Sequence, residues 1–403
     1  MRPSTDKSTG LTTVQEYAVY ATGLFTISTS HMSAVVVPLY ILTMNPSAFM
    51  VGIIVGARSY LTLLLSIHGG ALMDRLGVRR VMFFFAVLGV VTTLLYPLAA
   101  WPVAVLALQL VGGLTENMTW VGGQTLVGQT MRGEPVHAGR LSFATRVGAF
   151  VGPPVIGFTW DVAGAWGAFG FLALWLSVLL IAAWILPKQE SDARPLPPMV
   201  ELLPDYRDYI AAIKLLAVPA IAVTMVISLF RIGGVAVQSS FYVIYLQQID
   251  MTGAMIGTML AVSNGLAAAS SLFTRPFVRL MGEYWLMVLT SILAVLFIVV
   301  TPLFVAVLPL MICAVLRGVS MGISQVLLIS VTAKAGDSDS QGTAVGLRST
   351  FNNISSAFLP PLMGAIADLA GLDGAFAATA VLLIGGMLVA GIVGGRRGMG
   401  KVG

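Results

Sequence analysis

Apolar runs of about 20 residues recur from one end of this chain to the other, and short polar breaks separate them. An α-helix rises about 1.5 Å per residue, so a run of that length crosses a hydrocarbon core of about 30 Å. Only 10% of the 403 residues are charged, against about 25% in soluble domains. The sequence therefore predicts an all-α integral membrane protein.

The apolar runs number twelve and fall into two sets of six. They are expected near residues 17–42, 48–72, 80–99, 102–130, 140–161, 165–187, 215–247, 252–273, 284–302, 305–333, 341–366 and 373–394. Between the sixth and seventh lies the longest polar stretch, PKQESDARPLPPMVELLPDYRDY, whose proline and charge are typical of a linker. We therefore expect an N-terminal six-helix bundle at 1–187, a cytoplasmic linker at 188–214 and a C-terminal six-helix bundle at 215–403.

Matching residues in the two sets indicate an internal duplication. The pairs that lie 207 residues apart are Pro153 and Pro360, Pro154 and Pro361, Gly157 and Gly364, and Asp161 and Asp368. Two further pairs, Gly77 with Gly282 and Tyr40 with Tyr245, lie 205 residues apart. The two bundles are therefore expected to be pseudo-symmetric.

The positions of the 22 lysines and arginines predict the orientation in the membrane. Five lie inside expected helices, and the others lie in the tails and in the breaks after even-numbered helices. The positive-inside rule then places both termini and the linker in the cytoplasm of a multi-pass protein of the plasma (inner) membrane. The basic charge is thus an orientation signal, and we expect no nucleic-acid partner. The single cysteine, Cys313, offers no metal cluster, and no metal or cofactor is expected.

The polar island from Gly70 to Arg80 resembles the signature Gly-x-x-x-Asp-Arg-x-Gly-x-Arg-Arg of the major facilitator superfamily. The resemblance implies the twelve-helix fold of that family and a gating role for this loop. The loop's candidate gate residues are Gly70, Asp74, Arg75, Gly77, Arg79 and Arg80. Asp74 would pair with Arg132 or Arg140 when the inner gate is shut. The alternative is a plain topology anchor in a short loop.

A second motif, from Gly148 to Gly157, resembles the helix 5 Gly-x-x-x-Gly-Pro motif of the drug/proton antiporter branch, although Ile156 replaces one expected glycine. Small residues let another helix approach closely, and proline bends the helix. Gly148, Gly152, Pro153 and Gly157 are therefore further gate candidates by this resemblance. The alternative is packing without a gating role.

Charged groups inside the expected helices are candidates for coupling and for substrate binding, because ionisable groups at membrane depth are costly. Glu116 is the one acid at mid-membrane and is the candidate proton carrier. A permanent ion pair with Arg58 or Arg146 is the alternative. His31 is a second titratable candidate, with hydrogen-bonded packing as its alternative.

Arginines and amides at membrane depth are the candidate substrate ligands: Arg58, Arg146, Arg231, Asn264 and Asn352. Guanidinium groups bind carboxylates or phosphates in pairs of hydrogen bonds, which favours an anionic or zwitterionic solute. Helix 1 carries no acid at depth, which weighs against a pump for cationic drugs.

The sequence favours a secondary transporter that exports a small organic solute by alternating access in exchange for protons. An organic-anion uniporter or symporter is the first alternative, and a non-transporting membrane sensor on the same fold is the second. An enzyme is not expected, because the sequence shows no metal cluster and no paired carboxylates. The sequence also lacks a Gly-x-x-x-x-Gly-Lys loop, so ATP is not expected to drive transport directly. The expected partners are the solute, protons and the lipid bilayer, with the chain as a monomer.

Overall fold

The computed structural model describes residues 11–129, 131, 135–187, 214–335, 341–397 and 399. Within the helices, the side chains of 66–72, 74–75, 128–129, 135, 333–335 and 341–346 are not described. The predicted linker therefore lies almost entirely outside the described residues, and the bundle boundaries stay a prediction.

Every regular element in the described ranges is a helix. The long helices are α1 Thr13–Leu42, α2 Ala48–Leu76, α3 Val78–Leu95, α4 Pro102–Gln129, α5 Pro135–Ile185, α7 Pro219–Gln238, α9 Gly253–Ser271, α11 Glu283–Val299, α12 Val307–Ala335 and α13 Gln341–Arg396. Two short helices, α8 Phe241–Gln248 and α10 Thr274–Met281, complete the main set. All twelve apolar runs are helical over most of their length, as the sequence predicts.

Two of these helices contain two expected spans each. The backbone of α5 turns at Gly164 (φ 60°) and that of α13 at Gly371 (φ 74°), where the left-handed conformation favours glycine. Within the described ranges, eight helices are long and apolar enough to cross a membrane, and the bent pair α10–α11 makes a ninth if it is counted as one span. Helix α4 is not among them, because polar residues such as Gln109, Glu116 and Asn117 lower its hydropathy.

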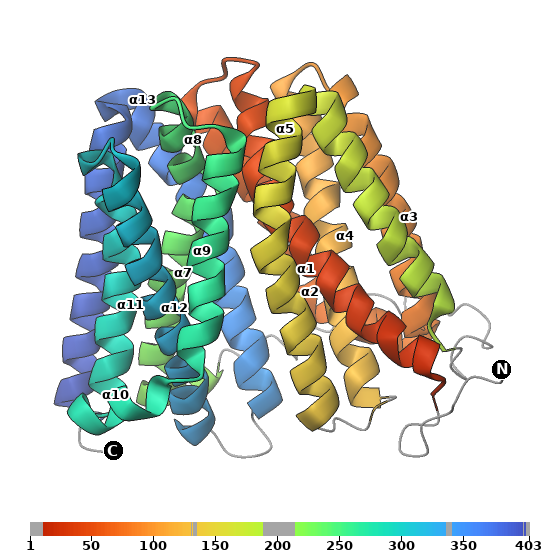
Figure 1. Ribbon diagram of the computed structural model, residues 1–403. Coiled ribbons are helices and arrows are strands. Elements are labelled where there is room, and N and C mark those ends of the chain that lie inside the picture. Colours follow the sequence, from red (N-terminus) through yellow and green to blue (C-terminus); the bar gives the residue numbers. More distant parts are fainter. Residues whose placement is uncertain are drawn as a thin grey trace. The chain divides into compact units, whose positions relative to one another are not determined.

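Two local features differ from the sequence prediction. The break after the eighth run contains α10, which is bent 113° from α11 and lies across the lower end of α11 in Figure 1. It combines Arg275 and Arg279 with exposed Phe277 and Leu280, a composition typical of a helix at a membrane surface. The seventh run is also interrupted, between α7 and α8, where Ser240 leaves the helical conformation (φ −133°, ψ −97°).

The backbone repeats itself in the way that the sequence pairs predict. Residues with positive φ occur in matching pairs: Asn45 and Asp250, Gly77 and Gly282, Gly164 and Gly371. Tyr40 donates a hydrogen bond to the Ala99 carbonyl at 3.1 Å, and Tyr245 donates one to the Phe304 carbonyl at 2.8 Å. The pseudo-symmetry therefore extends from turn conformation to side-chain contacts.

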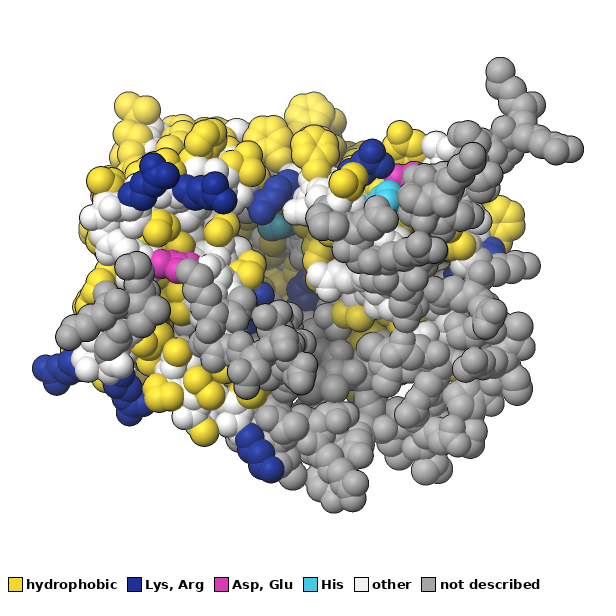
Figure 2. Space-filling model, turned by 90° about the horizontal axis from the view of Figure 1, so that it is seen from below, with side chains coloured by type: hydrophobic (Ala, Val, Ile, Leu, Met, Phe, Trp, Pro, Cys, Tyr) yellow, Lys and Arg dark blue, Asp and Glu magenta, His cyan; other side chains and the backbone are white. Residues whose placement is uncertain are grey.

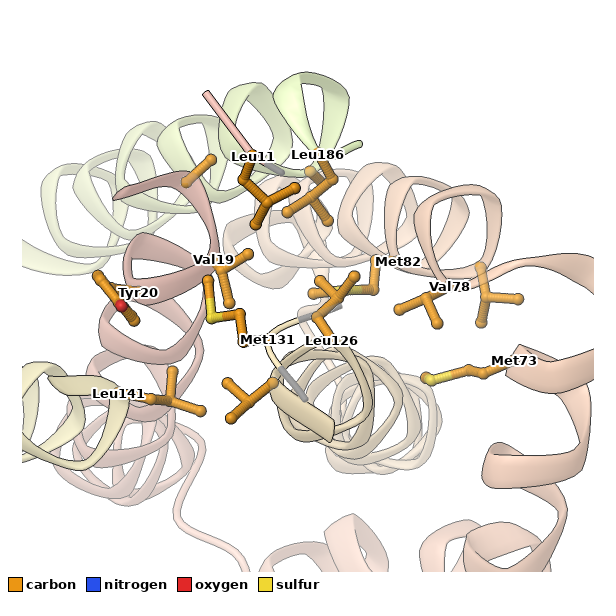
Figure 3. Packing of buried hydrophobic residues seen from close by; sticks show 14 residues of the cluster. Leu11, Val19, Tyr20, Met73, Val78, Met82, Leu126, Met131, Leu141 and Leu186 are labelled. Atoms are coloured by element: carbon orange, nitrogen blue, oxygen red, sulfur yellow. The ribbon is translucent and has the colours of Figure 1, made fainter. Parts of the chain in front are cut away.

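Two compact units contain the chain. Unit 1 is 1–44, 57–204 and 252–261; unit 2 is 45–56, 205–251 and 262–403. The start of α9 thus belongs to unit 1, and the start of α2 belongs to unit 2. Each unit has its own apolar core, and in unit 1 side chains such as Val19, Met82, Leu126 and Met131 converge from α1, α3, α4 and the residues that follow α4 (Figure 3).

Candidate functional site

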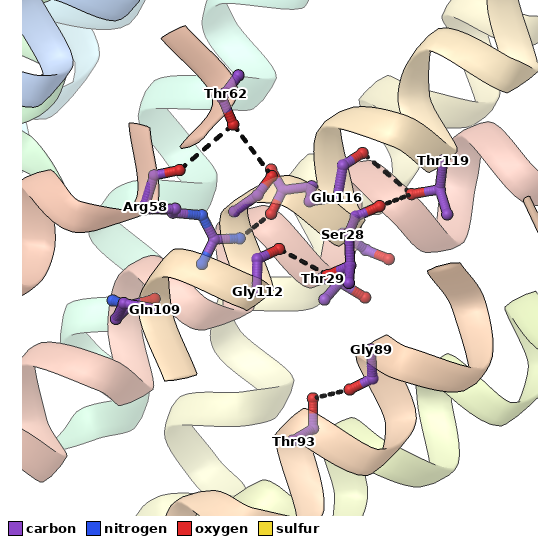
Figure 4. Close-up of polar contacts among 12 residues, drawn as sticks. Ser28, Thr29, Arg58, Thr62, Gly89, Thr93, Gln109, Gly112, Glu116 and Thr119 are labelled. Carbon is purple, nitrogen blue, oxygen red and sulfur yellow. Dashed lines mark hydrogen bonds and ion pairs between the residues drawn. The ribbon is translucent and has the colours of Figure 1, made fainter. Parts of the chain in front are cut away.

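An ion pair between Arg58 on α2 and Glu116 on α4 is the central charged feature of unit 1 (Figure 4). Both side chains are largely buried, at 23% and 19% exposed. Gly113, one turn before Glu116, makes the pair possible, because a Cβ there would overlap the Arg58 carbonyl. Thr62 joins the same helices by donating a hydrogen bond to the Gly113 carbonyl at 3.3 Å. Of the two partners that the sequence left open for Glu116, the structure pairs it with Arg58, while Arg146 is exposed.

A narrow cavity lies beside this ion pair, with about 40 Å³ of room for water. Hydroxyl groups from several helices line it, among them Thr26, Thr29 and Ser33 of α1 and Thr115 and Thr119 of α4. Ligand pockets for drug-sized solutes have about 300–1,000 Å³, so this cavity admits water and not an organic solute. His31, the second titratable candidate, is half-buried and lies within electrostatic reach of Arg58.

Three arginines cluster in unit 2. Arg231 on α7 lies within electrostatic reach of Arg317 on α12 and Arg348 on α13. Arg231 and Arg317 are only 2% and 3% exposed, and neither has an ion-pair partner among the described residues. The Arg231 guanidinium donates to Gln325 and to the Met321 sulfur, and Arg317 donates to Ser263 at 3.0 Å. Two buried cations are thus held by neutral groups alone.

The remaining candidate ligands are Asn264 and Asn352 in unit 2 and Arg58 and Arg146 in unit 1. Asn352 on α13 accepts a hydrogen bond from Ser228 of α7 at 2.8 Å and so ties these helices together. Asn264 on α9 is half-buried and follows Ser263, the partner of Arg317. Arg146 belongs to unit 1, and Arg58 is held by Glu116. The candidate ligands therefore divide between the two units. The structure also shows a helix break at Ser239–Ser240, a few residues after Arg231 along the chain. The sequence did not predict this break.

The polar island of α2 and α3 is only partly described. Gly77 has φ 87°, which explains the glycine at this turn, and Arg79 donates to the Trp184 carbonyl at 2.5 Å near the end of α5. Arg80 is exposed. The side chains of Gly70, Asp74 and Arg75, and Arg132 as a whole, lie outside the described residues. The described partner of Arg140 is Glu16, at 2.6 Å. The predicted pairing of Asp74 remains a prediction.

The glycines of the helix 5 motif lie against two other helices. Gly148 and Gly152 face α1, where a Cβ would press on Ser28 and on the Leu24 carbonyl. Gly157 faces the first turn of α9, and a Cβ there would overlap the Gly253 carbonyl. On the other side of that contact, a Cβ on Gly257 would overlap the carbonyl of Pro153. The motif thus permits backbone contact with two different helices.

Asp161 and Asp368, a pair in the internal repeat for which no role was predicted, each cap the start of another helix. The Asp161 carboxylate accepts from the backbone N–H groups of Gly253 (2.7 Å) and Ala254 (2.8 Å) at the start of α9. Asp368 does the same for Ala48 (2.8 Å) and Phe49 (3.0 Å) at the start of α2. First-turn N–H groups have no partner within their own helix, and the helix dipole favours a negative charge there.

We expect Asp161→Asn and Asp368→Asn each to lower the free energy of unfolding by about 1–2 kcal/mol, because an amide supplies one acceptor oxygen and no charge. The effects should add in the double variant, since the two contacts belong to different units and share no residue. Thermal unfolding of the detergent-purified protein measures this. Asp373→Asn, at an exposed aspartate of α13, is the matched control and should change stability by less than about 0.5 kcal/mol. Equal effects at all three sites would contradict the capping role.

Comparison with known proteins agrees with this architecture. The family model described as "Major Facilitator Superfamily" matches residues 19–233 and 224–398. The fold is similar to a variant of the nucleoside transporter NupG (12% identity, TM-score 0.77, 94% of this chain and 98% of that chain) and to unaltered NupG (12%, 0.73, 94% and 98%). It is also similar to a bacterial homologue of the human lysosomal transporter Spinster in an inward-facing, unoccupied conformation (13%, 0.73, 95% and 98%). A comparison with curated protein sequences gave no match. Since the family model covers nearly the whole chain, and the pseudo-symmetric helices give the expected fold, the chain belongs to the major facilitator superfamily, whose members are multi-pass membrane transporters of small molecules.

Proposed function

We propose that this transporter exports a small organic solute in exchange for protons, with Glu116 as the proton carrier. The observation that carries the proposal is the Arg58–Glu116 pair, a carboxylate and its counter-charge on two different helices beside a cavity that is lined in part by hydroxyl groups. Protonation of Glu116 removes the attraction that holds α2 to α4 at this point. The charge state of one carboxyl group then changes how two helices of unit 1 pack, which is what coupling requires.

The orientation that we propose has both termini and α10 in the cytoplasm of the plasma (inner) membrane. Lysine and arginine side chains are scattered over the face of the molecule seen from below, where few acidic side chains appear (Figure 2). Arg275 and Arg279 of α10 and Arg396 and Arg397 after α13 contribute basic charge. A surplus of positive charge is typical of the cytoplasmic side.

A second candidate, transport of an organic anion, is favoured by the unit 2 arginines. Arg317 and Arg348 lie within electrostatic reach of Arg231, and Arg231 and Arg317 have no acidic partner among the described residues. A carboxylate or phosphate on the solute would supply the missing negative charge. Arg146, Asn264 and Asn352 are the further ligands that we propose for either kind of solute.

The test is solute-driven proton movement in proteoliposomes that hold an internal pH dye. The panel contains cationic, zwitterionic and anionic compounds, together with a nucleoside because the similar structures include a nucleoside transporter. We expect at least one compound to move protons in the opposite direction, and Glu116→Gln to abolish that proton movement while solute binding persists.

Each result decides between the proposals. Proton movement with anions only, lost in Arg231→Gln, would favour the organic-anion candidate. Movement of labelled solute without protons in the unaltered protein would contradict antiport and leave the Arg58–Glu116 pair a structural contact.

A further inference from the structure

The cavity of unit 1 is small and partly open, and it lies among α1, α3, α4 and the second arm of α5 with hydroxyl groups in part of its lining. The cavity has a volume of about 40 Å³. One water molecule needs about 10–15 Å³, so the cavity has space for a small number of waters. The apolar side of the lining includes Leu172, Leu176 and Leu179, which close the cavity on the side of α5. The polar side brings hydroxyl groups and the Arg58–Glu116 pair to the same space.

The hydroxyl groups around this space are arranged as acceptors. Thr29, Thr115 and Thr119 donate their protons to carbonyls of their own helices, at 2.7–3.0 Å. Their oxygen lone pairs remain as acceptors for other groups. Thr26 differs, because its hydroxyl is fully buried and has no hydrogen-bond partner among the described residues. Buried polar groups without a protein partner are normally satisfied by ordered water.

A metal cation fits this space poorly. Glu116 is the one acidic side chain in its described lining, and the guanidinium of Arg58 already neutralises it. A second positive charge beside Arg58 would be repelled in surroundings of low dielectric constant. Neutral water, which both donates and accepts hydrogen bonds, matches a lining of acceptor hydroxyls, one unpartnered hydroxyl and an ion pair.

We infer that this cavity holds an ordered water cluster, positioned by Thr26, through which protons reach and leave Glu116. An excess proton carried by the cluster leaves its water oxygen, which breaks that O–H bond, and forms an O–H bond on a Glu116 carboxylate oxygen; this neutralises the carboxylate and opens its pair with Arg58. Release follows the same path, with the proton returning to a water oxygen and the pair re-forming. The inference rests on the proposed function in assigning the coupling proton to Glu116. Thr26 is a positioning residue, since it acts through the water.

The experiment compares Thr26→Val with Thr22→Val in the full-length protein. Valine has the shape of threonine without the hydroxyl. Thr22 is the matched control, because it is equally buried on α1 but donates to its own helix at the Val19 carbonyl and lies outside the cavity lining. Proteoliposomes with an internal pH dye give the rate of solute-driven proton movement. Infrared difference spectra across a pH jump give the carboxyl band of Glu116, assigned with Glu116→Gln, and the O–H bands of bound water.

We expect Thr26→Val to slow proton movement about tenfold and to alter the bound-water bands, with solute affinity unchanged. Thr22→Val should match the unaltered protein in all readouts, and Thr26→Ser should restore most of the rate. Equal behaviour of Thr26→Val and Thr22→Val would overturn the inference. A Glu116 band that titrates with no change in bound water would also overturn it while leaving the proposed antiport intact. Water bands that depend on Thr26, in a protein that moves solute without protons, would support the water cluster and reject the antiport.

Discussion

Replacing Arg58 with leucine is expected to lower the free energy of unfolding by about 3–5 kcal/mol, the largest stability change among these predictions. The substitution leaves the Glu116 carboxylate on α4 without its counter-charge at a site that is 19% exposed. Glu116→Leu should have a similar effect, because it strands the guanidinium. The double variant should regain most of the loss, since two apolar side chains that face each other need no charge compensation.

Thermal unfolding of the detergent-purified protein, with solute transport measured in parallel, checks this prediction. Arg146→Leu is the matched control for stability alone, because Arg146 is a proposed solute ligand but is exposed and has no ion pair among the described residues. It should change stability by less than about 1 kcal/mol. A double variant as unstable as the sum of the single variants would show that the two side chains act independently. A double variant that is stable but moves no protons would separate coupling from packing.

The fold was predictable because it depends on a local property, the length of the apolar runs. Whether a segment of about 20 residues can cross lipid is decided within that segment, so the twelve spans followed from the sequence. Helix α10 was not predicted. Its eight residues mix charged and apolar side chains, so in the sequence the segment looks like a polar break between apolar runs. The interruption at Ser239–Ser240 was hidden for the opposite reason, since the apolar run continues through it.

The candidate site was predictable only in part, because partners depend on which helices touch. The sequence identified Glu116 as the mid-membrane acid but left Arg58 and Arg146 open, and the choice depends on Gly113, which lets α4 approach the Arg58 backbone. Asp161 and Asp368 showed a repeat without a role, because each caps the start of a helix that is far away in the chain. A capping residue supplied by another helix leaves no signal beside the helix that it caps.

Replacing Gly157 with valine is expected to abolish transport and to lower the free energy of unfolding by about 3 kcal/mol, at the upper end of the range for overpacked sites. A Cβ at this position would overlap the Gly253 carbonyl, so valine fits only if α5 and α9 move apart and give up the packing between them. Gly364→Val should give the same result, because its Cβ would overlap the Ala48 carbonyl in the symmetry-related contact. Gly170→Val is the control on the same helix, since a Cβ there meets open space.

The transport rate and the free energy of unfolding, measured together, distinguish a gate from a contact that only packs the two helices. If this contact opens during transport, a smaller change, Gly157→Ala, should slow transport by much more than its loss of folded protein explains, because its Cβ also overlaps the Gly253 carbonyl and the closed conformation forms less readily. If the contact is packing alone, transport should fall only as far as the amount of folded protein falls. The Asp161 carboxylate caps the same turn of α9, so Asp161→Asn should change transport in the same direction as Gly157→Ala when the contact is a gate. Opposite directions for these two variants would contradict the gating role of the helix 5 motif.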